Sequence, residues 1–475
     1  MNNRKTYYRS AVLASALTGF IMLSGCTSDD TDTAQLRVIH ASPDAPAVNV
    51  QIDAMTEISN LDYAASSGYQ QIFAGQRNVT VEAIIPGGNA DVISVPGFSF
   101  GKDGRYTIIA VNNTSNIEPL VASESAATPA SNEVAIAVVH ASPAAANVDV
   151  YVTAPGVDIN TVNADFSFDF KGQVDAGAIP AGSYQIRVTA PGNKTVVFDS
   201  GPVDLSPFAG QKLLLAAIST TSSINQATSP IKLLVSTDSA DLTLLDTDTN
   251  VGARVVHVSP DAGTAAGGPV EVFASSTALT TSPTELIDAF SYTDIVPGIN
   301  TFVGVPAGDY IFDVAPDTDT IGDSVYTSPS LSLSQGVEYT VVAAGYVLTT
   351  PAFGLLATED NNRSVVTQAS VKVIHAAPAA GAVDVYVTAA GEFSSADVEN
   401  GLAGDPLLDD FTFGTITDYV AVAPGNYDIR VVAGGTTAIN VENFNLAAGS
   451  VSTVIAREPI DSGLPDDFNV ILLTN

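Results

Sequence analysis

Four histidines are the residues of this chain whose type and spacing best fit repeated chemistry. Each follows an apolar run and precedes a turn of small residues, as in RVIHASP and KVIHAAP. A histidine can serve as a general base, or it can bind a metal ion when further nitrogen, sulfur or oxygen ligands lie nearby. The four histidines are His40, His140, His257 and His375.

An acidic or amide residue follows each histidine. It is Asn49, Asp149 or Asp384 nine positions later, and Glu271 after a longer loop in the third copy. A metal site or an acid–base pair would not tolerate this drift, and one histidine without a cysteine per repeat is too few ligands for zinc. The pattern therefore predicts structural histidines, buried, with a ring nitrogen bonded to nearby backbone or to this acid.

The single cysteine, Cys26, stands at the end of a typical export leader. Residues 1–25 carry three basic residues and then an apolar run of about 15 residues, which is too short to span a membrane. The run ends in LSGC, which resembles the bacterial lipobox, where the cysteine is acylated and the chain is cut before it. An ordinary signal peptide with a chance cysteine is the alternative. We expect residues 26–35 to be an acylated tether, and the protein to be exported and lipid-anchored to the bacterial envelope, at the outer membrane if the cell is Gram-negative.

The charge of the chain excludes several partners. The 17 Lys and Arg face 51 Asp and Glu, a formal net charge of −34. Binding to nucleic acid needs clustered basic residues, and electrostatic docking on anionic lipid needs them too. We therefore expect no nucleic acid partner, contact with the membrane through the lipid anchor alone, and a protein or glycan as the remaining class of partner.

Two acid-rich loops are calcium candidates. Asp246 and Asp248 begin a segment like an EF-hand loop, but it lacks the glycine at the sixth position and flanking helices. Asp317, Asp319 and Asp323 form the second loop. Calcium at such loops would stiffen an array of domains, whereas ordinary solvated loops are the simpler interpretation. No other cofactor is expected.

Two further patterns are set aside. The GFSFG segment at 97–101 has the spacing of a hydrolase nucleophile elbow, but the residues after it predict a strand where the elbow needs a helix. A Lys–Asn isopeptide common to all repeats is excluded because no lysine occurs between Lys232 and Lys372, which flank the third repeat.

The chain contains four copies of one sequence unit, and each passage that recurs in these copies predicts a strand. The histidine passage recurs at intervals of 100, 117 and 118 residues, and a P-x-G-x-Y passage and closing apolar runs follow in most copies. Its β-branched run without polar alternation is typical of a strand buried on both faces. No window predicts a long capped helix. The sequence therefore predicts an all-β tandem array of four antiparallel β-sandwiches, immunoglobulin-like or transthyretin-like, each folding by itself and parted by polar linkers, at 36–125, 134–240, 252–358 and 371–475.

These passages resemble a bacterial family catalogued as domain of unknown function 4397. The resemblance rests on HASP-x-A, VDVYV, the P-x-G-x-Y strand and the closing strand, and covers nearly all of the mature chain, best in the second and fourth copies. It implies tandem copies in secreted and surface proteins, many with lipoprotein leaders. It implies no activity and no catalytic residues.

Three functions follow as hypotheses. Repetition without a unique polar cluster favours a non-enzymatic envelope lipoprotein that binds a partner or acts as a spacer. An envelope hydrolase or carbohydrate-processing enzyme would instead need two carboxylates about 5–10 Å apart in one cleft. A calcium-stiffened, adhesin-like array is the third.

Overall fold

The computed structural model describes residues 32–125, 127–221, 229–238, 240–318, 321–459 and 468–474. The leader, Cys26 and most of the predicted tether lie outside the described residues. None of the described helices is long and apolar enough to cross a membrane.

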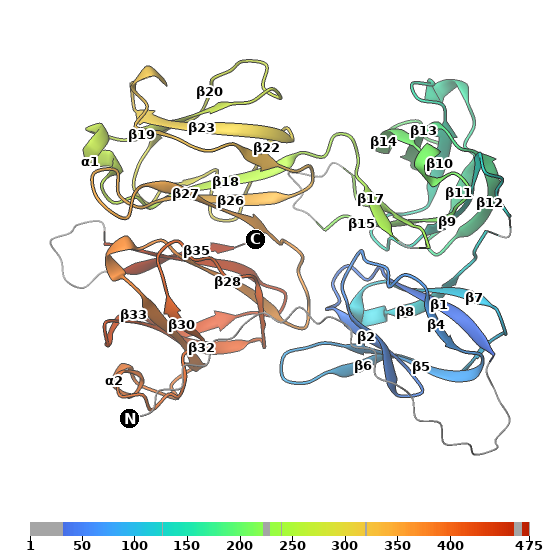
Figure 1. Ribbon diagram of the computed structural model, residues 1–475, viewed down its shortest axis with the longest axis horizontal. Helices are drawn as coiled ribbons and strands as arrows, with labels where there is room; N and C mark the ends of the chain where they lie inside the picture. Colours follow the sequence, from blue (N-terminus) through green and yellow to red (C-terminus); the bar gives the residue numbers. More distant parts are fainter. Residues whose placement is uncertain are drawn as a thin grey trace, which may run out of the picture.

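The described chain is built almost wholly of strands, in four successive units (Figure 1). Unit 1 holds β1 (Thr33–His40), β2 (Val48–Ile52), β3 (Met55–Leu61), β4 (Gln70–Phe73), β5 (Gly75–Ala83), β6 (Ala90–Phe100), β7 (Arg105–Val111) and β8 (Glu118–Ala122). Unit 2 holds β9 (Glu133–His140), β10 (Val148–Thr153), β11 (Phe166–Phe168), β12 (Gln173–Pro180), β13 (Ser183–Thr189), β14 (Val196–Asp204), β15 (Lys212–Ser219), β16 (Ile231–Ser236) and β17 (Asp241–Leu244).

Units 3 and 4 repeat this order, with two strands of unit 3 each split in two. Unit 3 holds β18 (Val251–His257), β19 (Val270–Ser275), β20 (Thr284–Phe290), β21 (Ile295–Val296), β22 (Val303–Val305), β23 (Gly308–Pro316), β24 (Tyr326–Thr327), β25 (Leu331–Leu333), β26 (Glu338–Ala344) and β27 (Gly354–Asp360). Unit 4 holds β28 (Ala369–His375), β29 (Val383–Ala389), β30 (Leu408–Phe411), β31 (Val420–Val422), β32 (Gly425–Ala433), β33 (Thr436–Leu446), β34 (Val451–Arg457) and β35 (Asn469–Thr474).

The helices are short and lie in loops. They are the one-turn helices α1 (Ala262–Ala266) and α2 (Ser395–Glu399), and the 3-10 turns η1 (Thr114–Asn116), η2 (Ile159–Thr161), η3 (Ser206–Phe208), η4 (Ile321–Asp323) and η5 (Pro378–Ala380). In α2 the side chain of Ser394 accepts a hydrogen bond from the backbone N–H of Asp397, whose carboxylate caps Ser394 in return. This capping box stabilises a single turn, which is shorter than any helix that sequence periodicity could reveal.

Each unit is a sandwich of two sheets with the same strand order. In unit 1 the orders are β4-β1-β7-β8 and β3-β2-β5-β6, and the other units match them, with β17 added at one edge in unit 2. An immunoglobulin sandwich instead joins its first, second, fifth and fourth strands in one sheet. The predicted all-β fold of tandem sandwiches is confirmed, and of its two predicted forms this order leaves the transthyretin-like one.

One strand pair in each unit is parallel. The strand that ends in the histidine runs parallel to the seventh strand of its unit, as β1 does to β7 and β9 to β15. The pairs β18–β26 and β28–β34 repeat this arrangement. The remaining ladders are antiparallel, so each sandwich is antiparallel except at the centre of its histidine-bearing sheet.

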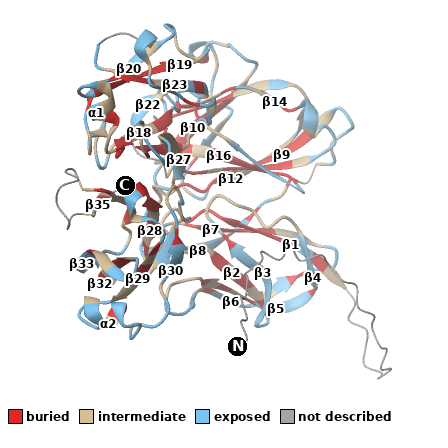
Figure 2. Ribbon diagram, turned by 60° about the vertical axis from the view of Figure 1, so that its left-hand side comes forward, coloured by how far each residue is buried: buried red, intermediate tan, exposed pale blue. Residues whose placement is uncertain are grey.

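The four units pair through the outer faces of their histidine-bearing sheets. Ile39 and Ile109 of unit 1 pack in one apolar cluster with Val139 and Leu214 of unit 2. A second cluster joins units 3 and 4 through Val256, Val258, Val342, Ala344, Ile374, Ala376, Ile455, Ile471 and Leu473. The first cluster covers the outer faces of β1 and β9, whose inner faces line their own sandwiches, so most residues of both strands are buried (red in Figure 2). The four sandwiches predicted from the sequence therefore contact one another through apolar outer faces, a contact that the polar linkers between them did not reveal.

The two pairs lie side by side, and the ends of the array meet. Arg363, which lies between units 3 and 4, donates to the carbonyl of Ala45 and forms an ion pair with Asp62 in unit 1. The backbone N–H of Val366 donates to the carbonyl of Asp44 at 3.0 Å. The first and last units are therefore neighbours, which gives the square arrangement seen in Figure 1.

Candidate functional site

The repeated histidine is buried at the end of the first strand of its unit. Side-chain exposure is 0% for His40 and at most 2% for the other three. Nδ1 of His40 accepts the backbone N–H of Ser42 at 3.3 Å, and Nε2 lies 2.9 Å from the carbonyl oxygen of Pro46. Because a backbone N–H can only donate, the ring proton must be on Nε2, which donates to that carbonyl.

The same geometry recurs in the other units. His140 uses Ser142 N–H and the Ala146 carbonyl, and His375 uses Ala377 N–H and the Gly381 carbonyl. In unit 3, Nδ1 of His257 accepts from Ser259 N–H at 3.2 Å, and α1 occupies the position of the turn. The ring therefore closes the loop between the first two strands, and backbone is the partner that the structure supplies.

An aromatic side chain from another loop packs on each histidine ring. The ring centroids of His40 and Tyr63 lie 6.1 Å apart, with the planes at 89°. The equivalent residues pack edge-on in the same way, and they are Phe170, Tyr292 and Phe413. These aromatics could not be identified from the sequence alone, because their separation from the histidine along the chain varies with loop length. Their signal is the L-D-Y, F-D-F, F-S-Y and F-T-F passages in the four units.

Burial leaves the histidines uncharged. Desolvation is the largest cause that lowers the pKa of His40, His140 and His375, and it lowers that of His257 to about 4. A ring with both nitrogens engaged by backbone has no lone pair free for a metal ion and no route to a substrate proton. This arrangement supports a structural role for the four histidines.

The acid that follows the histidine points to the other side of its sheet. The second strand turns Val148 and Val150 into the sandwich, so Asp149 between them faces outward, away from the ring. Its carboxylate accepts the Ser167 hydroxyl and, at 2.8 Å, the Gly192 N–H, and these bonds hold its pKa below the ordinary value. The acid is therefore not the partner of the histidine.

In units 1 and 4 the residue at this position also bonds a group other than the histidine. Oδ1 of Asp384 accepts the N–H of Asp410 at 3.0 Å, and Oδ1 of Asn49 accepts the N–H of Asn60 at 3.1 Å. Asp410 and Asn60 both have positive φ, at a bulge in the third strand. In units 1 and 4 the position therefore fixes a bulge, which the amide of Asn49 does as well as the carboxylate of Asp384. In unit 3 the residue is Glu271, which is fully buried on β19.

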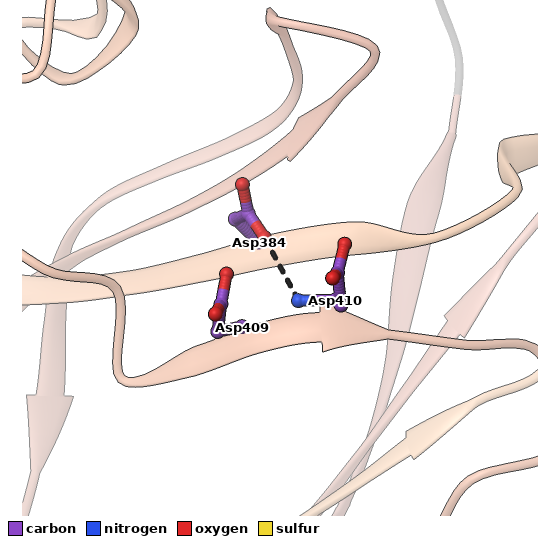
Figure 3. Close-up of side chains that lie close together, drawn as sticks. All are labelled: Asp384, Asp409 and Asp410. Carbon is purple, nitrogen blue, oxygen red and sulfur yellow. Dashed lines mark hydrogen bonds between the residues drawn. The ribbon is translucent and has the colours of Figure 1, made fainter. Parts of the chain in front are cut away.

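One group of three carboxylates stands out among the described residues. Asp384 on β29 and Asp409 and Asp410 on β30 bring carboxylate oxygens within 4.8 Å of one another (Figure 3). Desolvation, and then the charge on Asp384, raise the pKa of Asp409. Three hard oxygen ligands are fewer than the six to eight that calcium takes, and Asp384 already serves the bulge. The cluster is explained by the bulge, and the sequence analysis had singled out only Asp384 of the three.

The calcium candidates of the sequence analysis are not gathered into a site among the described residues. Asp246 is buried, and its carboxylate accepts the backbone N–H groups of Asp199 and Asp248 at 2.8 and 2.9 Å. Asp248 itself is exposed, as are Asp317 and Asp323, whereas Asp319 lies outside the described residues. The carboxylate of Asp246 therefore holds the segment between units 2 and 3 through backbone bonds.

A buried basic residue three positions before the histidine links the paired units. In unit 1, Arg37 is 1% exposed and bonds Thr107, Glu124 and, across the interface, the carbonyl of Thr237 in unit 2. Unit 2 has Ala137 at this position, inside the interface cluster. The signal was present in the RVIH, AVVH, RVVH and KVIH passages, but the sequence could not say what covers this face.

Units 3 and 4 place two such cations at one carboxylate. Asp360 pairs with Arg254 at 3.2 Å and with Lys372 at 3.8 Å, and all three side chains are at most 4% exposed. The hydroxyl of Tyr419 in unit 4 donates to the same carboxylate at 2.9 Å. Burial, with the neighbouring Asp360 next, raises the pKa of Tyr419. Such a buried, mutually bonded network specifies how two surfaces align, and its groups are not free for chemistry.

A polar cavity of about 260 Å³ lies where units 2 and 3 meet the segment before unit 4. Its lining includes the basic residues Lys232 and Arg363 and the acidic residues Asp246, Glu338 and Asp360. Burial, and then the charge on Arg363, lower the pKa of Lys232. Glu338 accepts from the side chain of Asn362, Asp246 and Asp360 carry the bonds given above, and a fourth lining residue, Glu359, is exposed.

The GFSFG segment is a strand end, as expected. β6 runs to Phe100, and β7 begins at Arg105, with no helix between them. The backbone N–H of Gly101 donates to the hydroxyl of Tyr106 at 2.8 Å.

The P-x-G-x-Y tyrosine has a defined task. In units 2, 3 and 4 its hydroxyl donates to a carbonyl four residues earlier, as Tyr184 does to Pro180 at 2.8 Å, Tyr310 to Pro306 and Tyr427 to Ala423. This hydrogen bond fixes the turn that leads into the fifth strand of each of these units.

Comparison with protein families identifies most of the chain. The model described as "Domain of unknown function (DUF4397)" matches residues 34–151, 254–386 and 388–470. The resemblance expected to be best in the second unit is not, because residues 152–253 lie outside the matched segments. No curated protein matches the chain.

Solved structures give only distant likenesses. The Bacillus anthracis TIE protein is 8% identical over 90% of this chain and 69% of its own, with a TM-score of 0.15. A streptococcal ancillary pilin is 9% identical over 68% and 98% of the two chains, with a TM-score of 0.14. A putative cell adhesion protein from Bacteroides fragilis NCTC 9343 is 12% identical over 47% and 97%, with a TM-score of 0.10.

Proposed function

Because this chain belongs to the DUF4397 family of domains of unknown function, whose description names no activity, we propose a function from its own residues. The protein is a lipid-anchored, non-enzymatic component of the bacterial envelope. It presents two joined pairs of β-sandwiches on a short tether, as a binding or spacer module whose partner is a protein or a glycan.

The observation that carries this proposal is that the histidine recurring in all four units has a structural role. All four histidines are buried, and their Nδ1 atoms are bonded to backbone, so the feature that repeats builds the fold. The single cysteine at the end of the leader supplies the anchor. With a net charge of −34, the module repels anionic lipid, which keeps it off the membrane surface that the anchor attaches it to.

The anchor is tested by Cys26→Ala in the parent cell. The wild-type protein should partition into detergent and incorporate a labelled fatty acid, and the variant should do neither, because acylation needs the thiol. Cys26→Ser is the control for side-chain size and should behave like the alanine variant. Unchanged detergent partitioning of both variants would refute lipid anchoring.

The binding role is tested separately. Chemical cross-linking of the anchored protein in intact envelopes, followed by isolation of its adducts, should capture a protein or a glycan. Turnover of a glycan or peptide by the purified chain would instead support an enzyme.

A further inference from the structure

The sandwich of unit 2 contains an apolar cavity that units 3 and 4 have only in reduced form. The cavity lies between the two sheets and measures about 240 Å³, against about 120 Å³ in unit 3 and about 100 Å³ in unit 4. Protein interiors are close-packed, and voids much larger than one water molecule are rare. A void at least twice the size of its counterparts in units 3 and 4 therefore needs a reason.

The extra volume coincides with the extra strand of unit 2. β17 adds a fifth strand at the edge of the β12-β9-β15-β16 sheet. Its Leu242 and Leu244 extend the wall of the cavity beyond the sandwich proper. Leu242 is 41% exposed, so this part of the cavity wall lies at the surface of the molecule.

The lining defines the chemistry of an occupant. Nearly all lining side chains are aliphatic or aromatic, and the three exceptions are already bonded. Nε2 of His140 donates to Ala146, Asp165 accepts the N–H of Val152, and the Tyr184 hydroxyl donates to Pro180. Asp165 is the one carboxylate among these lining side chains, and it is exposed to solvent, so the enclosed part of the wall is apolar apart from the bonded His140 and Tyr184.

We propose that unit 2 is a binding site for a small, uncharged apolar molecule held between its two sheets. An apolar cavity of about 150 Å³ stays dry and takes up benzene, so this cavity accommodates roughly ten carbon atoms. The occupant restores the dispersion contacts that the empty cavity lacks. The hydrocarbon part of a lipid or an alkylbenzene has this chemistry, whereas a sugar, an amino acid or a metal ion does not.

The test uses the full mature chain and n-butylbenzene, measured by titration calorimetry and thermal unfolding. One molecule should bind per chain and raise the melting temperature, because a ligand of the folded state stabilises it. 4-Propylphenol has the same number of heavy atoms but would bury an unpaired hydroxyl. Its affinity should therefore be lower than that of n-butylbenzene by a factor of about ten or more.

Matched variants locate the site. Ala217 on β15 lines the cavity of unit 2, and Ala343 on β26 is its equivalent in unit 3, each facing the histidine across the parallel pair. Ala217→Leu should reduce n-butylbenzene binding more than tenfold, and Ala343→Leu should leave it unchanged. Ala176→Leu on β12 fills the same cavity and serves if Ala217→Leu fails to fold. Absence of n-butylbenzene binding, binding that survives both unit 2 substitutions, or equal binding of 4-propylphenol would overturn the proposal.

Discussion

Each histidine ring stands in the loop between two strands as a neutral hydrogen-bonding link. Its Nδ1 accepts a backbone N–H two residues later, and in His40, His140 and His375 its Nε2 faces a carbonyl six residues later. Protonation would put a proton on Nδ1, facing an N–H that already points at it. Desolvation and this geometry act in the same direction, and both favour the neutral ring.

The depressed pKa of His257 makes stability depend on pH. In the unfolded chain this histidine titrates near pH 6.5, and in the folded chain near 4. Between these values the unfolded state binds the proton and the folded state does not, so its contribution to stability is complete above pH 6.5 and is lost as the pH falls toward 4. The free energy of unfolding should therefore fall by about 1 kcal/mol per pH unit between pH 6 and 5 through this residue.

Urea unfolding of the wild type and of His257→Gln, at several pH values, measures this effect. Glutamine is neutral throughout and retains an acceptor for the Ser259 N–H, so the difference between the two proteins isolates the histidine. A difference that does not change between pH 7 and pH 5 would show that this ring titrates normally in the folded state.

At the scale of strands and loops, the loop that returns to the histidine has one conformation in all four units. The residue after the ring-packing aromatic has positive φ, whether it is Ala64, Lys171, Thr293 or Gly414. Its N–H donates to the carbonyl of the histidine in each unit, at 2.8 or 2.9 Å. The loop therefore demands a left-handed residue, which glycine provides without strain and threonine does not.

Substitutions at this position should change the free energy of unfolding in opposite directions in units 3 and 4. Gly414→Ala should lower the free energy of unfolding by about 1 kcal/mol, because its added Cβ meets only an ordinary contact with Leu356 at 3.7 Å and the cost is conformational. Thr293→Gly should raise it by about the same amount, since a β-branched residue is strained at a φ of 73°. Chemical denaturation measures both. A destabilising Thr293→Gly would mean that side-chain contacts outweigh the backbone at this position.

The limits of sequence prediction are visible at the same scale. The first, second, fifth, seventh and eighth strands were predicted, because each carries a recurring apolar run such as VDVYV or IKLLVS. The third and fourth strands, and the sixth strand apart from the GFSFG segment of unit 1, have largely exposed sequences that differ between units, so no recurring pattern predicted them. The burial of the histidine followed from its repeated context, whereas its aromatic neighbour did not, because loops of different length separate the two in sequence.

At the scale of the whole molecule, the two-sided burial of the first strand is explained by the neighbouring unit. The run VAIAVV of β9 turns Val134 and Ile136 into its own sandwich and Ala137 and Val139 onto unit 1. The sequence predicted such burial, but nothing local to the strand says that a second sandwich provides half of it. The buried cation Arg37 also fixes how units 1 and 2 align, because it has its full set of hydrogen-bond partners only when Thr237 of unit 2 is present.

Units 1 and 2 should therefore fold as one cooperative body, which is the central claim about this architecture. The most direct measurement compares the thermal unfolding of residues 134–240, unit 2 alone, with that of residues 32–246, the joined pair. The account predicts a single sharp transition for the pair, and for the single unit a loss of cooperativity or self-association through its exposed Val139 and Leu214 face. A monomeric fragment 134–240 that unfolds cooperatively at the same temperature as the pair would contradict it.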